Sequence, residues 1–84
     1  MYTISDHASE EAKRRGIDLQ ILDDVMKNPQ QIVESYAGRV IYQSKVEMDE
    51  KLYLIRAIVE LSEPLLVVTV YRTSQIEKYW ESES

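Results

Sequence analysis

Two runs of sequence decide the fold: KLYLIRAIVEL (residues 51–61) and LLVVTVYR (residues 65–72). Both runs are rich in β-branched and aromatic residues, which favour strands. The three residues that separate them, Ser-Glu-Pro, are typical of a turn. The two runs therefore predict a pair of neighbouring antiparallel strands.

Alternation along these strands predicts which side chains lie under the helices, because a slip of one residue moves every side chain to the other face. One face is wholly apolar and is expected to be the buried one. It comprises Tyr53, Ile55, Ala57, Val59, Leu61, Leu66, Val68 and Val70. The opposite face comprises Leu52, Leu54, Arg56, Ile58, Leu65, Val67, Thr69 and Tyr71.

This second face is also largely apolar and must be covered in so small a protein. The cover is either the C-terminal segment or another subunit. The residues expected to form this interface are Leu52, Leu54, Ile76, Tyr79 and Trp80.

Two helices are predicted before the strands. Ser5 and Asp6 are good N-cap residues and Gly16 is typical of a helix end, so residues 6–15 are expected to be helical. Asp18 can cap a second helix, which Asn-Pro at residues 28–29 ends. Its apolar positions repeat at helical spacing: Ile17, Ile21, Leu22, Val25 and Met26.

After residue 30 the hydrophobic period changes from 3.6 to 2, which predicts strands over residues 31–36 and 39–47. At the C-terminal side, Ser74 and Glu77 fit a capping box for a last helical turn. The expected fold class is α+β: two N-terminal helices packed on a four-stranded antiparallel β-sheet, with a short C-terminal helical turn. With 84 residues, the chain is expected to be a single domain over residues 1–84.

Composition excludes several classes of protein. The chain has no Cys and one His, so we expect no disulfide, no metal and no cofactor. No stretch approaches the ~18 apolar residues of a membrane span, and we expect a soluble, cytoplasmic protein. The formal net charge of −5 counts against generic nucleic-acid binding, yet it leaves room for a local basic site.

The remaining polar residues suit a metal-free reaction on a phosphodiester. His7 can donate or accept a proton, and Tyr71 can act as a second acid. Arginine side chains can bind phosphate. These arginines are Arg14, Arg15, Arg39 and Arg56.

Each candidate also has a structural interpretation. His7, Glu11 and Arg14 share one helix face, which fits either a catalytic histidine or a solvated surface. Arg56 lies in mid-strand among apolar residues, where a guanidinium is costly to bury without a partner. That partner is either a phosphate or a carboxylate of the chain, Glu60 or Glu34.

Five stretches resemble a known family over nearly the whole chain. They are RRGI (residues 14–17), VMKNP (25–29), GRVIY (38–42), YLIR (53–56) and VVTVYRTSQIEKYW (67–80). The family is catalogued as domain of unknown function 4258 and consists of small bacterial and archaeal proteins. It is similar to the RelE, barnase and EndoU class of metal-independent ribonuclease toxins, in which a sheet face receives RNA. Many relatives carry an Arg four residues after the His, where this chain has Glu11.

The resemblance implies a catalytic group of His7, Arg56 and Tyr71, with Arg15, Arg39 and Thr69 binding RNA phosphate. The implied function is a metal-independent endoribonuclease of toxin type, with RNA as substrate and an antitoxin as partner. The alternative is a non-catalytic protein-interaction or RNA-binding module that forms a homodimer or binds a small protein partner.

Overall fold

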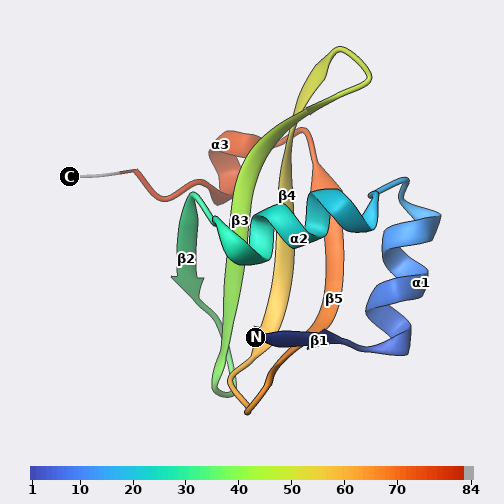
Figure 1. Cartoon of the computed structure of the whole chain (residues 1–84). Helices are drawn as coiled ribbons and strands as arrows, with labels where there is room; N and C mark the ends of the chain where they lie inside the picture. The colour runs from blue at the N-terminus through green and yellow to red at the C-terminus, as the bar shows by residue number, and fades with distance from the viewer. Residues whose placement is uncertain (83–84) are drawn as a thin grey trace.

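The computed structural model describes residues 1–82 and shows one five-stranded sheet crossed by a helix (Figure 1). The strands are β1 (Tyr2–Ile4), β2 (Gln31–Glu34), β3 (Arg39–Met48), β4 (Lys51–Glu60) and β5 (Leu65–Thr73). The helices are α1 (Asp6–Arg14), α2 (Leu19–Lys27) and α3 (Ile76–Tyr79). The strand order in the sheet is β1-β5-β4-β3-β2.

The fold class is α+β as predicted, but the predicted four-stranded antiparallel sheet is only partly right, because the sheet has a fifth strand, β1. The sheet is mixed, because β1 pairs in parallel with β5 while all other neighbours are antiparallel. A strand of three residues is too short to show a hydrophobic period. Its partner lies near the other end of the chain, so the pairing depends on tertiary structure.

Both predicted N-terminal helices form with the predicted caps. The Ser5 side chain accepts a hydrogen bond from the backbone of Ala8, and Asp18 accepts one from Gln20. Gly16 ends the first helix with φ +68°, a conformation that favours glycine. No helix within residues 1–82 is long and apolar enough to cross a membrane.

The C-terminal turn forms, but without the predicted capping box. Its N-cap is Gln75 instead of Ser74, and no side chain caps it. The Gln75 backbone N–H donates to Thr73 Oγ1 at 3.0 Å, so the end of β5 takes the place of the cap. This one-turn helix therefore depends on contacts with the sheet for its stability.

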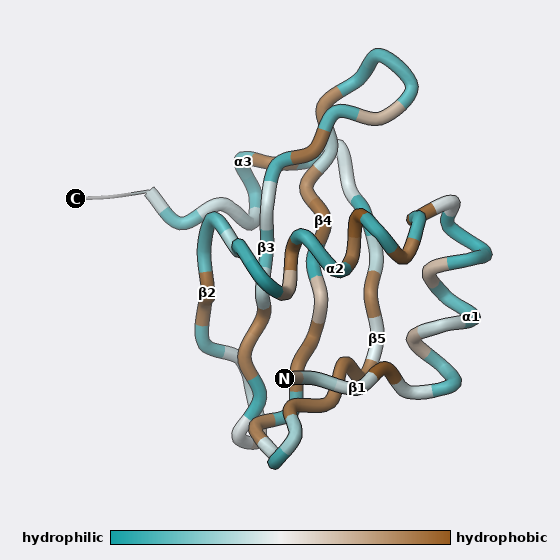
Figure 2. Tube along the Cα trace, viewed as in Figure 1, coloured by the Kyte–Doolittle hydropathy of each residue, from teal (hydrophilic) through white to brown (hydrophobic). Residues whose placement is uncertain are grey.

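The main core lies between the N-terminal helices and one face of the sheet. Figure 2 shows the apolar turns of α2 in front of the apolar stretch of β4. The buried residues of this cluster are Ala8, Ala12, Ile17, Leu22, Val25, Met26, Ile55, Ala57, Val59, Val67 and Val70. The predicted buried face of β4 is confirmed for Ile55, Ala57 and Val59, whereas Leu61 lies beyond the strand and is 58% exposed.

The predicted faces of β5 are only partly right. A register shift lies between Ile58 and Val59, which pair with Thr69 and Val67, so Val68 is the extra residue of a bulge. As a result Val67 is fully buried in the main core instead of lying on the opposite face. The run is apolar on both sides of the bulge, so its sequence gives no sign of the shift.

Candidate phosphate-binding site around Arg56

Arg56 lies in the middle of β4, on the sheet face opposite α2, and is 7% exposed. Its Nε donates to Gln43 Oε1 at 2.8 Å, and its Nη1 donates to the Tyr71 hydroxyl at 2.5 Å. Gln43 and Tyr71 are the residues directly across from Arg56 on β3 and β5. The strand register therefore places an acceptor on each side of the guanidinium.

The C-terminal segment covers this arginine. The Tyr79 ring lies 4.3 Å from Arg56 Cζ and packs edge-on against the Tyr71 ring, with centroids 6.4 Å apart. Gln43 Nε2 donates to the Tyr79 backbone oxygen at 3.2 Å. Leu54 on the same face is fully buried. Of the two predicted covers, the C-terminal segment thus occupies the part of the face around Arg56.

Within residues 1–82, no carboxylate lies within ion-pair distance of Arg56. Glu60 lies 3.9 Å from Arg39 instead, and Glu34 is exposed on β2. The interpretation that Arg56 balances Glu60 or Glu34 is therefore wrong. A nearly buried guanidinium with only neutral partners retains a full positive charge and an affinity for anions.

The guanidinium also retains unused donors. Of its five N–H groups, those that donate within the described residues go to Gln43 and Tyr71. Nη2 has no hydrogen-bond partner among the described residues. A phosphate that reached the guanidinium would find this donor unused.

The other predicted site residues do not all gather at Arg56. Thr69 lies two residues before Tyr71 on β5 and is half-buried. His7 is exposed in the first turn of α1, and no hydrogen bond within the described chain joins it to Arg56 or Tyr71. Ser5 anchors this turn to the edge of β5, where its Oγ donates to the Val68 oxygen at 3.0 Å.

Arg15 and Arg39 are engaged elsewhere. Arg15 Nε lies 3.1 Å from Glu11, which also accepts a hydrogen bond from Arg14 at 2.8 Å. The hydrogen bond from Arg14, with a further one from Arg15, lowers the pKa of Glu11 below its ordinary value. The structure therefore brings Arg56 and Tyr71 into contact and places Thr69 on the adjacent strand, but does not bring His7, Arg15 or Arg39 to them.

Two residues of this site, Gln43 and Gln31, were not among the predicted ones. Gln43 is fully buried and its Nε2 donates to Gln31 Oε1 at 2.8 Å. The Gln31 side chain in turn contacts the backbone of Glu81. A glutamine at an inward position of β3 was the available signal, but its partner is evident only from the strand register.

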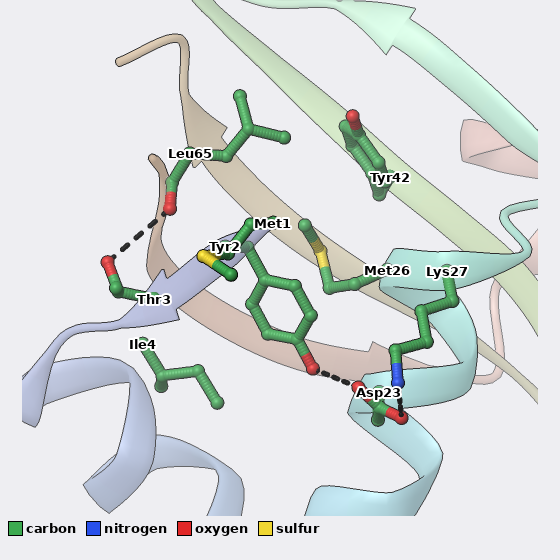
Figure 3. A pocket seen from close by; sticks show the side chains of 9 residues that line it. All are labelled: Met1, Tyr2, Thr3, Ile4, Asp23, Met26, Lys27, Tyr42 and Leu65. Carbon is green, nitrogen blue, oxygen red and sulfur yellow. Dashed lines mark hydrogen bonds and ion pairs between the residues drawn. The ribbon is translucent and has the colours of Figure 1, made fainter. Parts of the chain in front are cut away.

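A separate open cavity of about 910 Å³ lies beside β1 and α2 (Figure 3). On its wall the Tyr2 hydroxyl donates to Asp23, which also pairs with Lys27 at 3.1 Å. Burial, together with the hydrogen bond to Asp23, raises the pKa of Tyr2 to about 12. The hydrogen bond from Tyr2, followed by that from Lys27, lowers the pKa of Asp23.

No group of three or more His, Asp or Glu side chains within residues 1–82 is placed to hold a metal ion. What the Arg56 site offers is cation and hydroxyl chemistry. A phosphate oxygen can accept from the guanidinium, while the Tyr71 hydroxyl can donate a proton to a neighbouring oxygen.

Comparison with known proteins gives one result. No curated protein and no solved structure matches the chain. The model of the family "Domain of unknown function (DUF4258)" matches residues 4–72, which contain Arg56, Tyr71 and both missed glutamines but end before α3. This match covers most of the chain, and the protein therefore belongs to the DUF4258 family.

Proposed function

We propose that the protein is a metal-independent endoribonuclease whose centre is the Arg56–Tyr71 pair. The observation that carries this proposal is the nearly buried Arg56 guanidinium, which has neutral partners on both sides and no carboxylate among the described residues. Proteins rarely keep a guanidinium in such a position without a counter-ion, and a phosphate would supply one. The resemblance to ribonuclease toxins of the RelE and barnase class supports the same chemistry.

In this reaction the ribose 2′-oxygen attacks the adjacent phosphorus and the bond from phosphorus to the 5′-oxygen breaks. The products are a 2′,3′-cyclic phosphate and a 5′-hydroxyl. Arg56 would stabilise the charge that develops on the phosphate oxygens. The Tyr71 oxygen already accepts from Arg56, so its own proton is free to pass to the leaving 5′-oxygen.

The 2′-hydroxyl proton needs a base, and His7 remains the predicted one. The first turn of α1 is fixed to the edge of β5 by Ser5, on the strand that carries Tyr71. His7→Gln is expected to lower the cleavage rate without changing RNA affinity, because a base acts in the transition state. An unchanged cleavage rate in this variant would remove His7 from the reaction.

The experiment is cleavage of single-stranded RNA of mixed sequence in the presence of EDTA, with and without ribosomes. Arg56→Lys keeps the charge but loses the planar fork, so we expect a rate lower by ~10²-fold or more. Arg72→Lys is the matched control, because Arg72 lies on the same sheet but beside the Tyr53 ring. Wild-type protein that leaves RNA intact under all these conditions would refute the enzyme.

A non-catalytic interaction module is the second candidate. It is favoured by Leu52, which is 48% exposed at the start of β4, and by the net charge of −5, which disfavours RNA. In this case the protein is expected to be a homodimer or to bind a small protein partner such as an antitoxin. Sedimentation at ~100 μM tests the homodimer, since this concentration far exceeds a micromolar dissociation constant. A monomer at this concentration would exclude it.

A further inference from the structure

The C-terminal residues 76–81, called the strap below, lie over the Arg56 site and are held there by hydrogen bonds and aromatic contacts. They include α3, which is a single turn with no buried residue. Within the described chain, the strap contacts the sheet through the side chains of Gln31, Gln43, Lys45, Arg56 and Tyr71. A one-turn segment without a fully buried residue is among the first to open in a folded protein.

The attachment of the strap is centred on one glutamine of the edge strand β2. Gln31 Nε2 donates to the Glu81 oxygen at 2.6 Å, and the Glu81 N–H donates to Gln31 Oε1 at 3.1 Å. The same Gln31 oxygen accepts from Gln43, which holds both Arg56 and the Tyr79 backbone. Gln31 therefore joins the end of the strap to the partner of Arg56.

With the strap in place, a phosphodiester cannot reach Arg56. The residue is 7% exposed, and the Tyr79 ring covers the guanidinium at 4.3 Å. A phosphate that accepts two N–H bonds needs a wider opening than this, because it must place two oxygens in the guanidinium plane. The strap and a phosphate ligand therefore cannot occupy the Arg56 site at the same time.

We propose that the strap is an autoinhibitory cover, fastened by Gln31, which must leave Arg56 before a phosphodiester can bind. This inference rests on the proposed function of the Arg56 site. The apparent affinity for RNA is then the affinity of the open form multiplied by the fraction of molecules whose strap is open. Loss of the Gln31 hydrogen bonds is expected to raise the open fraction about 5- to 30-fold.

The first experiment measures the strap without any ligand. Trp80 is the only tryptophan of the chain, and the Lys45 ammonium lies 4.1 Å from its ring centroid. Quenching of Trp80 fluorescence by acrylamide should therefore increase in Gln31→Ala. Gln30→Ala is the matched control, because Gln30 bonds to the Lys45 backbone and has no hydrogen bond to residues 76–81. Equal quenching in the three proteins would overturn the proposal.

The second experiment measures binding of a single-stranded 2′-O-methyl RNA, which the protein cannot cleave. Gln31→Ala is expected to bind it about 5- to 30-fold more tightly than wild type, with Gln30→Ala unchanged. Equal affinity of Gln31→Ala and wild type would overturn the strap but leave the proposed function intact. Absence of binding in every variant, or binding that Arg56→Lys does not weaken, would instead refute the proposed function and the strap together.

A third variant tests the opposite change. The chain has no native Cys, so Gln31→Cys combined with Glu81→Cys can be joined by a short reducible cross-linker. Cross-linked protein is expected to lose at least ~10-fold in affinity for the 2′-O-methyl RNA and to recover on reduction. Cross-linked protein that binds as tightly as the reduced form would show that the strap need not leave.

Discussion

The two faces of the sheet are built from different interactions. The face under α1 and α2 is closed by aliphatic side chains that are fully buried, such as Ile55 and Leu22. The face under the strap has fewer buried aliphatic side chains, among them Leu54, and adds a chain of polar contacts that runs through Gln31, Gln43, Arg56 and Tyr71. Aliphatic packing is non-directional and strong in sum, whereas each polar contact adds little net free energy and depends on its geometry. The first face therefore holds the fold, and the second can open.

The sharpest test of this difference uses two neighbouring residues of β4 that are both fully buried but point to opposite faces. Ile55→Ala is expected to lower the free energy of unfolding by about 4 kcal/mol, because the main core cannot close the resulting cavity. Leu54→Ala should cost only about 2 kcal/mol, because the strap can move into the space. Urea unfolding measures both values. Equal losses would show that the strap is packed as rigidly as the main core.

Removal of the buried guanidinium should have a smaller effect. Arg56→Ala leaves the Gln43 oxygen without its donor in a nearly closed space, for which we expect a loss of about 2 kcal/mol. Arg72→Ala is the control on the other face and should cost less than about 1 kcal/mol, since Arg72 is partly exposed. A thermal midpoint in Arg56→Ala at or above that of wild type would mean that the buried charge destabilises the folded state.

The contact between Ser5 and the edge of β5 is expected to have an intermediate effect on stability. Ser5→Ala removes the N-cap of α1 and the bond to Val68 at the bulge, with an expected loss of about 1 kcal/mol. Ser9→Ala, at an exposed position of the same helix, should change stability by less than about 0.5 kcal/mol. Thermal unfolding of the two variants distinguishes them. A neutral Ser5→Ala would show that packing of Ala8 and Ala12 alone fixes this helix.

The smallest expected effect is a dependence on pH at the cavity beside β1. The pKa of Asp23 is lowered in the folded state, so its contribution is present above its ordinary pKa and is lost as pH falls through the folded value. The pKa of Tyr2 is raised from 10.0 to about 12, so stability should also fall as pH rises through this range. Tyr2→Phe should weaken both dependences. Urea midpoints that vary with pH equally in wild type and Tyr2→Phe would contradict this.

Local patterns determined most of the fold and part of the site. Caps at Ser5 and Asp18, the helix end at Gly16 and the alternation of β4 are properties of short segments, and the structure has them as predicted. The same alternation predicts Arg56 and Tyr71 on one face, and the strand register confirms it. Short-range interactions suffice for such features because their free energies depend on residues only a few positions apart.

Tertiary structure decided the features that join distant parts of the chain. These are the parallel pairing of β1 with β5, the bulge at Val68, and the position of the strap on Arg56. The segments involved are short, and each is compatible with more than one partner. Only the packing of the whole chain selects the partner. Forming one long-range contact costs conformational entropy, and this cost must be offset by many other contacts that form at the same time.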